Sequence, residues 1–280
     1  MIENPIFLDR VIKMALEEDL GAGDLTTDAI VDPAGGGKAV LLSRERLVLA
    51  GLAVFTRVFE VLSSDVTFDA YFQDGQTVPK GEKIGLLSGP LGAILKGERT
   101  ALNFLQRMSG IATLTRRYVD KAGSQKVKVV DTRKTAPGLR VLDKYSVRMG
   151  GGFNHRLGLF DGILIKDNHI AAAGSVSKAV SLAKKKAPHT VKIEVEVEDL
   201  KGVEDAIRAG ADAILLDNMS PEMMRKAVDV VAGRVEIEAS GNINLENIEE
   251  VAKTGVNIIS VGALTHSPRA VDLSLEVMKI

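Results

Sequence analysis

The sequence contains no cysteine and no tryptophan, and aromatic residues make up only 4% of its 280 positions. The lack of cysteine excludes disulfides, thiolate zinc sites, iron–sulfur clusters and cysteine nucleophiles. There is no basic excess, because 36 lysines and arginines face 37 acidic residues, and this argues against nucleic acid as a partner. No apolar run approaches the ~20 residues that span a bilayer, and the N-terminus lacks a signal-peptide pattern. We therefore expect a cytoplasmic protein with an aliphatic core and no membrane partner.

The remaining composition, 45% hydrophobic and 26% charged, is that of a globular protein. At about 150 residues per domain, the length suggests two domains. Apolar stripes predict helices over residues 5–18 and 93–120, with another helix near 52–62. Short apolar runs separated by Gly and Asp indicate strands and turns over 38–90, including a structural hairpin at 74–84.

From about residue 125 onward, apolar strands alternate with amphipathic helices. The expected strands cover residues 126–131, 162–166, 191–197, 212–217, 234–239 and 256–261. The expected helices cover residues 138–149, 175–187, 199–209, 221–232 and 245–254. Near-continuous Val, Ile and Leu runs in this alternation predict a parallel sheet. No Gly-x-Gly-x-x-Gly motif follows the first strand, which disfavours a dinucleotide-binding fold.

Nearly every predicted strand closes with polar residues, although charge is costly within an ordinary buried strand. These endings are Asp131-Thr-Arg-Lys134, Lys166-Asp-Asn168, Glu194-Val-Glu196, Asp217-Asn218, Glu238-Ala-Ser-Gly241 and Ser260-Val-Gly262. Polar residues at the C-terminal ends of parallel strands are how a β/α barrel builds its active site. Because a complete eight-unit barrel takes about 200 residues or more, we expect an open barrel.

Basic residues gather at these strand ends and in the loop before the second strand. They are Arg133, Lys134, His155, Arg156 and Lys166. Arginine offers a planar fork that suits carboxylate or phosphate, and lysine adds a point charge. Fixed positive charges in one pocket repel each other unless an anion enters, so we predict a substrate with two or more negative groups. The alternative is a set of ordinary surface residues.

Glu196 and Asp217 end two neighbouring predicted strands. Paired carboxylates at this position suit Mg²⁺ together with a substrate phosphate. Glu194, Glu196 and Glu198 are alternate residues, so they fall on the same face of the strand. The sequence therefore leaves open which of the three faces the site. The alternatives for the carboxylates are a proton-transfer role or an ion pair with Lys166.

Ser240-Gly241 and the Ser260-Val-Gly262 segment follow late strands, where barrels often bind phosphate. Small residues there let backbone N–H groups approach an anion. No Gly-x-Ser-x-Gly nucleophile elbow is present, and the histidines lack metal-ligand spacing, so covalent catalysis and zinc are disfavoured. The residues alone predict a barrel enzyme with a polyanionic substrate, a phosphate site and Mg²⁺.

A series of motifs runs in order from residue 19 to residue 267. It comprises Asp19-Leu-Gly-x-Gly-Asp24, Glu98-Arg-Thr-Ala-Leu-Asn103, Asp131-Thr-Arg-Lys-Thr-x-Pro-Gly-Leu-Arg140, Lys144-Tyr145, Gly150-Gly-Gly-x-Asn-His-Arg156, Leu164-Ile-Lys-Asp-Asn-His169, Glu194-Val-Glu196, Leu215-Leu-Asp-Asn218, Glu238-Ala-Ser-Gly241 and Leu264-Thr-His-Ser267. The series resembles the quinolinate phosphoribosyltransferase family. One departure is visible, since the family often has a second glycine after Ser-Gly where this chain has Asn242. Asparagine tolerates a left-handed backbone, so the loop can keep its shape.

The resemblance implies an α/β fold with an N-terminal α/β sandwich over residues 1–110. It implies an open α/β barrel of about six to seven units over 111–267, with residues 268–280 packing back on the first domain. The implied reaction transfers phosphoribosyl from phosphoribosyl pyrophosphate to quinolinate with loss of CO₂, giving nicotinate mononucleotide and pyrophosphate for NAD biosynthesis. It implies a homodimer that uses Mg²⁺ and no organic cofactor.

Matched residue by residue, the resemblance also implies the site. Quinolinate would be bound by Arg133, Lys134, His155, Arg156 and Lys166, and by Arg99 of the second subunit. Phosphoribosyl pyrophosphate would be bound by Glu196, Asp217, Ser240, Gly241 and Gly262. The implied catalytic residues are Lys134, Glu196 and Asp217, and the latter two would reach Mg²⁺ largely through substrate and water.

Two other interpretations stay open at this point. One is a related phosphoribosyltransferase that acts on nicotinate or another aromatic acid, including paralogues found beside molybdate transport. The other is a non-catalytic protein that binds anionic metabolites. The basic residues at 133, 134, 156 and 166 favour an acceptor with two carboxylates.

Overall fold

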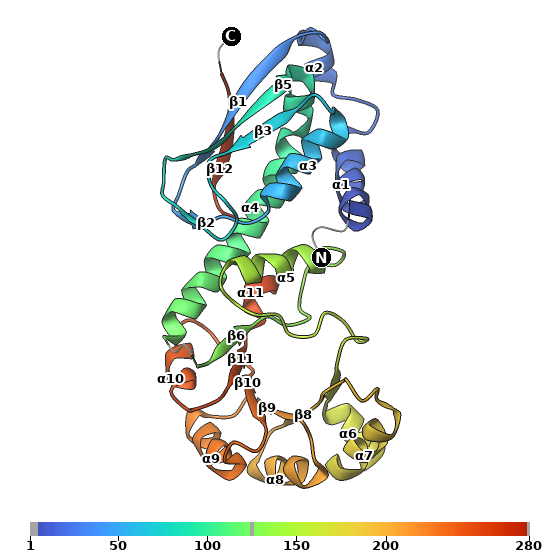
Figure 1. Ribbon diagram of the computed structural model, residues 1–280, viewed down its shortest axis with the longest axis vertical. Coiled ribbons are helices and arrows are strands. Elements are labelled where there is room, and N and C mark those ends of the chain that lie inside the picture. The colour runs from blue at the N-terminus through green and yellow to red at the C-terminus, as the bar shows by residue number, and fades with distance from the viewer. Residues whose placement is uncertain (1–4, 124–125, 279–280) are drawn as a thin grey trace. The chain divides into compact units, whose positions relative to one another are not determined.

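The computed structural model describes residues 5–123 and 126–278, which form two compact units (Figure 1). Unit 1 comes from Met1–Arg116, Thr135–Gly151 and Ser267–Ile280, and unit 2 comes from Arg117–Lys134 and Gly152–His266. Compared with the division expected from the sequence, the main difference is the segment Thr135–Gly151, which groups with unit 1. The chain therefore passes between the units more than once.

Unit 1 is built on an antiparallel sheet with the strand order β12-β1-β5-β3. These strands are β1 (Gly36–Ser43), β3 (Thr67–Ala70), β5 (Lys83–Pro90) and β12 (Leu273–Val277). The C-terminal segment supplies β12, which pairs with β1 and places Leu275 opposite Leu41. The hairpin predicted at 74–84 is wrong, because β4 (Thr77–Val78) pairs with β2 (Leu47–Val48) while β5 pairs with β1 and β3.

The helices that begin in unit 1 are α1 (Pro5–Leu20), α2 (Leu25–Ile30), α3 (Leu52–Leu62), α4 (Leu91–Ala122) and α5 (Arg140–Met149). Of these, α3 and the N-terminal part of α4 lie beside the sheet, and α1 packs against α3 (Figure 1). The predicted apolar stripes are buried, as Ile12 of α1 and Phe55 of α3 illustrate. Unit 1 is thus the expected α/β sandwich. Throughout the two described stretches of the chain, no helix combines the length and apolar sequence that a bilayer crossing requires.

Unit 2 contains a parallel sheet with the strand order β6-β11-β10-β9-β8-β7. The strands are β6 (Lys128–Val130), β7 (Ile163–Ile165), β8 (Ile193–Val197), β9 (Ala213–Asp217), β10 (Glu236–Ser240) and β11 (Ile258–Ser260). Each lies at a predicted strand. Among the described residues β6 and β7 form the two edges and do not pair with each other, so the barrel is open, as expected.

Helices follow the strands of unit 2 and lie along the outer side of the curved sheet (Figure 1). They are α6 (Asp167–Ala173), α7 (Val176–Lys186), α8 (Leu200–Ala209), α9 (Pro221–Val231), α10 (Ile248–Ala252) and α11 (Ala263–His266). Ser175, Asp199 and Ser220 accept hydrogen bonds from the first turns of α7, α8 and α9 and so begin these helices. Because all six strands run parallel, their C-terminal ends meet at one edge of the sheet.

Candidate active site

A cavity of about 610 Å³ opens at the C-terminal ends of the unit 2 strands. It is lined by Thr132, Arg133, Lys134, His155, Arg156, Leu164, Lys166, Glu196, Leu215, Asp217, Asn218, Glu238, Ser240, Gly241, Asn242 and Ser260. The structure therefore brings together the basic residues, the paired carboxylates and the Ser-Gly loop that the sequence pointed to. All of them lie within unit 2.

The loop after β6 carries Arg133 and Lys134 into the cavity. Its backbone is fixed at Lys134, whose N–H donates to Thr132 Oγ1 at 3.0 Å and whose carbonyl accepts from Thr265 Oγ1 at 2.8 Å. A Cβ added at Gly262 would lie 3.1 Å from Cδ of Lys134. Gly262 thus packs against the lysine stem and is not one of the lining residues, so its contact with phosphate stays a prediction.

Asp131 fixes the loop that carries His155 and Arg156. It is fully buried, and its carboxylate accepts hydrogen bonds from Asn154 Nδ2 at 2.6 Å and from the backbone N–H of His155 at 2.9 Å. Buried carboxylates need such donors, so Asp131 positions the loop that carries His155 and Arg156. The only sequence signal at Asp131 was its place at the end of a predicted strand, and this positioning role was not predicted.

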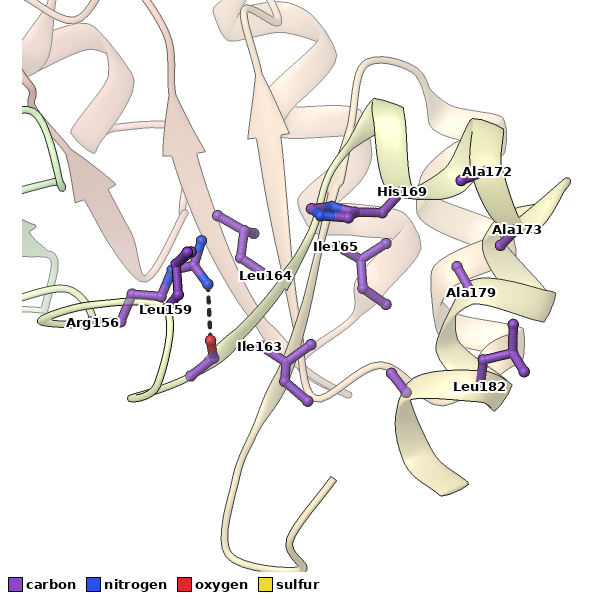
Figure 2. Close-up of a pocket in the computed structure, with 12 residues that line it drawn as sticks. Arg156, Leu159, Ile163, Leu164, Ile165, His169, Ala172, Ala173, Ala179 and Leu182 are labelled. Carbon is purple, nitrogen blue, oxygen red and sulfur yellow. Dashed lines mark hydrogen bonds between the residues drawn. The ribbon is translucent and has the colours of Figure 1, made fainter. Parts of the chain in front are cut away.

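Arg156 lies beside another cation. Its Nη1 donates to the carbonyl of Gly162 at 2.9 Å, the bond drawn as a dashed line in Figure 2. Burial, and next the positive charge of Arg133, lower the pKa of Arg156, while Glu194 acts in the opposite direction. Repulsion between like charges is relieved when an anion binds between them. The predicted crowding of positive charge is therefore present in the folded chain.

Lys166 and Glu196 end the paired strands β7 and β8, and their side chains form an ion pair with Nζ 2.6 Å from Oε2. The alternative interpretation of Glu196 as an ion-pair partner is therefore correct as a description of this structure. Asp217 ends β9, and its Oδ2 accepts from Asn218 Nδ2 at 2.8 Å. Among the three glutamates left open by the sequence, Glu196 lines the cavity.

Glu194 instead belongs to a cluster with His155 and Glu238, in which Glu238 is buried and the other two side chains are partly buried. Nε2 of His155 lies 3.3 Å from Glu194 and 3.5 Å from Glu238. Burial, followed by the negative charge of Glu194, raises the pKa of Glu238 to about 7, and His155 opposes the shift. The three side chains offer ligand atoms within 4.8 Å of one another, so they could hold a cation, but a proton on Glu238 relieves the same repulsion. The sequence signal for this cluster was only that Glu238 ends a strand.

The loop after β10 has a left-handed backbone at two successive positions. Gly241 has φ 90° and Asn242 has φ 52°. Asn242 thus adopts the left-handed backbone that asparagine tolerates, and the conservation of the loop's shape stays a prediction. Ser240 and Gly241 both line the cavity, as expected for a loop that approaches an anion.

A second cavity of about 530 Å³ is lined by residues of β7, α6 and α7 (Figure 2). Its walls are mostly apolar, with Ile163, Ile165 and Leu182 among them. Arg156 and Leu164 line both cavities. The charged residues predicted from the sequence gather in the first cavity, which is therefore the candidate active site.

Comparison with known proteins identifies the family. The family model described as "Quinolinate phosphoribosyl transferase, C-terminal domain" matches residues 111–276, and the model of the N-terminal domain matches residues 24–109. The chain belongs to the quinolinate phosphoribosyltransferase family. Together the two matches cover nearly the whole chain, including every strand that contributes to the cavity.

Individual members of the quinolinate phosphoribosyltransferase family are similar over most of their length. A probable nicotinate-nucleotide pyrophosphorylase (carboxylating) of Bacillus subtilis strain 168 is 44% identical over 274 residues, which cover 98% of this chain and 94% of that protein. Quinolinate phosphoribosyltransferase (decarboxylating) 1 of Nicotiana glauca is 42% identical, covering 96% of this chain and 82% of that protein. The crystal structure of NadC from Streptococcus pyogenes superposes with a TM-score of 0.95 at 45% identity, covering 99% of each chain.

A further site residue implied by the quinolinate phosphoribosyltransferase family lies, like Gly262, outside the lining of the cavity. Arg99 is exposed on α4 in unit 1 and is not among the lining residues. Its neighbour Glu98 is partly buried, and this burial raises the pKa of Glu98. The role of Arg99 in the site of a second subunit stays a prediction.

Proposed function

We propose that the strand-end cavity of unit 2 is the active site in which this chain carries out the reaction of its family. The chain is a pentosyltransferase enzyme of NAD biosynthesis that transfers phosphoribosyl from phosphoribosyl pyrophosphate to quinolinate with decarboxylation. The products are nicotinate mononucleotide, pyrophosphate and CO₂. One observation carries the site assignment: four fixed cations and the three carboxylates of Glu196, Asp217 and Glu238 line a single cavity at the strand ends.

The basic side chains suit quinolinate, which is a dianion with two adjacent carboxylates. Arg133 and Arg156 supply planar forks and Lys134 and Lys166 supply point charges, so two carboxylates can be bound at once. His155 belongs to the same wall, where it stands between Arg156 and the two glutamates of its cluster. A monoanionic acid such as nicotinate would leave part of this positive charge unpaired.

The cavity contains no evident nucleophile, which supports a direct displacement. The pyridine nitrogen of quinolinate attacks C1 of the ribose, and the bond from C1 to pyrophosphate breaks. The transition state has oxocarbenium character, so carboxylates such as Glu196 and Asp217 stabilise the positive charge that develops on the ribose. The ring nitrogen is then cationic and stabilises the electron pair that remains on C2 when the C2–carboxylate bond breaks and CO₂ departs. C2 then takes up a proton from water to give nicotinate mononucleotide. Lys134 provides positive charge that compensates the quinolinate carboxylates and the pyrophosphate, which meet near C1 of the ribose.

The residues at the ends of β8 and β9 fit Mg²⁺. Carboxylate oxygens are ligands that Mg²⁺ prefers, and one or two carboxylates are enough when substrate phosphates and water complete the shell. In each carboxylate one oxygen has a partner, Lys166 for Glu196 and Asn218 for Asp217, and the second oxygen is available to a ligand. We assign Glu196 and Asp217 to hold Mg²⁺ largely through substrate and water, where the ion neutralises charge on the leaving pyrophosphate.

The 5′-phosphate is assigned to the loops after β10 and β11. Ser240 and Gly241 line the cavity, and the left-handed backbone at Gly241 suits an approach by an anion. Gly262 lies beside the stem of Lys134 in the loop after β11, and we assign its backbone to the same phosphate.

We also propose that the enzyme is a cytoplasmic homodimer in which each active site receives Arg99 from the other subunit. The exposure of Arg99 on α4 is compatible with a contact to a second chain. A symmetric dimer would then contain two composite sites.

The function is tested by measuring pyrophosphate release with quinolinate and, separately, with nicotinate. We expect release with quinolinate, accompanied by an equal amount of CO₂, and none with nicotinate. Equal turnover of both acids would overturn the acceptor assignment. Binding of quinolinate without any release would instead favour the non-catalytic, anion-binding interpretation.

A further inference from the structure

Two asparagine side chains connect the loop after β10 to a carboxylate of the proposed site. Asn242 Nδ2 donates to Asn218 Oδ1 at 2.9 Å, and Asn218 Nδ2 donates to Asp217 Oδ2 at 2.8 Å. All three residues line the same cavity. A short chain of hydrogen bonds, the amide relay, thus runs from Asn242 through Asn218 to Asp217.

The chemistry of the groups fixes the direction of this relay. An ionised carboxylate only accepts hydrogen bonds, so Asn218 must turn its NH₂ group toward Asp217. Its carbonyl oxygen then points to the other side and requires a donor. Asn242 supplies that donor through its own NH₂ group. Each amide orientation therefore depends on the next group in the relay.

The backbone around Asn218 leaves its amide little freedom. Asn218 has φ 54°, and its N–H donates to the carbonyl of Ser240 at 2.9 Å. A Cβ added at Gly241 would lie 2.3 Å from Asn218 Oδ1, so the amide packs directly on the glycine backbone. The carbonyl of Asn242 accepts from Asn247 Nδ2 at 3.0 Å, which fixes the far end of the loop.

We propose that Asn218 is a positioning residue for Asp217 and that Asn242 acts through Asn218. The inference rests on the proposed role of Asp217. Holding Oδ2 of Asp217 in one hydrogen bond keeps the carboxylate in a single orientation and leaves Oδ1 for the ligand. A glycine at position 242 would keep the backbone but has no side chain to bond Asn218.

The decisive experiment is a double-mutant cycle with Asn218→Gly and Asn242→Gly. Both positions have left-handed φ values that glycine adopts readily, so the substitutions remove the amides and keep the backbone. We expect Asn218→Gly to lower kcat about tenfold and Asn242→Gly about threefold, with the KM for quinolinate unchanged within about twofold. The double variant should be no slower than Asn218→Gly, because Asn242 acts only through Asn218.

Two further variants invert the hydrogen-bond chemistry at nearly constant shape. Asn218→Asp places a second carboxylate beside Asp217, and Asn242→Asp turns an acceptor toward Asn218 Oδ1. Each should reduce kcat more than the corresponding glycine variant does, since repulsion replaces a missing bond. Additive glycine effects, or aspartate variants as active as the wild type, would overturn the relay.

Ala232→Gly is the matched control, because Ala232 also has a left-handed backbone, with φ 48°, at the end of α9 outside the cavity. It should show wild-type kinetics, and the melting temperature of every variant is measured alongside. Asp217→Asn separates the relay from the proposed function. If Asp217→Asn is fully active, the role of Asp217 is wrong and the inference fails with it. If Asp217→Asn is inactive while Asn218→Gly has wild-type kinetics, only the relay is wrong.

Discussion

Nζ of Lys166 lies 2.6 Å from Oε2 of Glu196, so a cation and a carboxylate of the proposed site neutralise each other. The glutamate side chain is only 13% exposed, whereas the lysine side chain is 45% exposed. A quinolinate carboxylate that binds Lys166 must therefore compete with Glu196 for the same ammonium group. Glu196 is therefore expected to oppose the binding of quinolinate while it supports the reaction.

Glu196→Gln should bind quinolinate more tightly and turn it over more slowly than the wild type. Removing the negative charge frees Lys166 for the substrate, and we expect the dissociation constant to fall by about threefold to tenfold. We expect kcat to fall at least about a hundredfold, because the carboxylate no longer stabilises the ribose or its metal. Calorimetric titration and pyrophosphate release check the two effects. Glu198→Gln, on an exposed neighbour outside the cavity, is the control. Weaker quinolinate binding by Glu196→Gln would contradict the competition.

Lys134→Ala and Arg156→Ala should weaken the binding of quinolinate far more than the binding of phosphoribosyl pyrophosphate. A buried ligand charge that loses its partner costs about 2–5 kcal/mol, which is a change of at least about thirtyfold in affinity. Separate calorimetric titrations with each substrate test this selectivity. Lys226→Ala is the matched control, since Lys226 forms a surface ion pair with Glu222 on α9. Unchanged quinolinate affinity in both site variants would place these residues outside the site.

Stability should depend on pH through Glu238. Its pKa is raised to about 7 in the folded chain, against 4.5 for an ordinary glutamate. A carboxyl group that binds its proton more tightly in the folded state stabilises the fold at low pH. This contribution, on the order of 3 kcal/mol, is lost as the pH rises from about 4.5 through about 7. The melting temperature should therefore fall across this range.

Glu238→Gln, which is neutral at every pH, should flatten this pH dependence and melt at a higher temperature than the wild type near pH 8. Thermal denaturation between about pH 5 and pH 8 measures the difference. Glu246→Gln, at an exposed position in the loop before α10, should leave the slope unchanged. The same slope in the wild type and in Glu238→Gln would rule out Glu238 as the titrating group.

Arg99→Ala and Glu196→Ala should complement each other when they are produced together. If Arg99 acts in the partner's site, a mixed dimer carries both defects in one site and leaves the other site intact. Random pairing makes half of the dimers mixed, so about a quarter of all sites should be active. Each variant alone should be inactive. The presence of mixed dimers is confirmed by mass spectrometry. If such a sample shows only background activity, the shared-site proposal is wrong.

The sequence by itself determined the strand–helix alternation of unit 2 and the polar residues at its strand ends. Both signals are local, because apolar runs and helical stripes are formed by residues that are close together in the sequence. Parallel strands then bring their ends together whatever the detailed packing, so Arg133, Lys166 and Asp217 could be placed in one site without a structure. The left-handed conformation of Asn242 was also a local property of its residue type.

Only the tertiary structure decided which side chain each glutamate of β8 contacts. Glu194 and Glu196 alternate identically along β8, yet one lies beside His155 and the other beside Lys166. Their partners come from the loop before β7 and from the end of β7, and the register of β7 on β8 sets which glutamate each one meets. The pairing of β4 with β2 was likewise invisible in the sequence. Pairing and burial depend on segments distant along the chain, and no short stretch of sequence contains both partners.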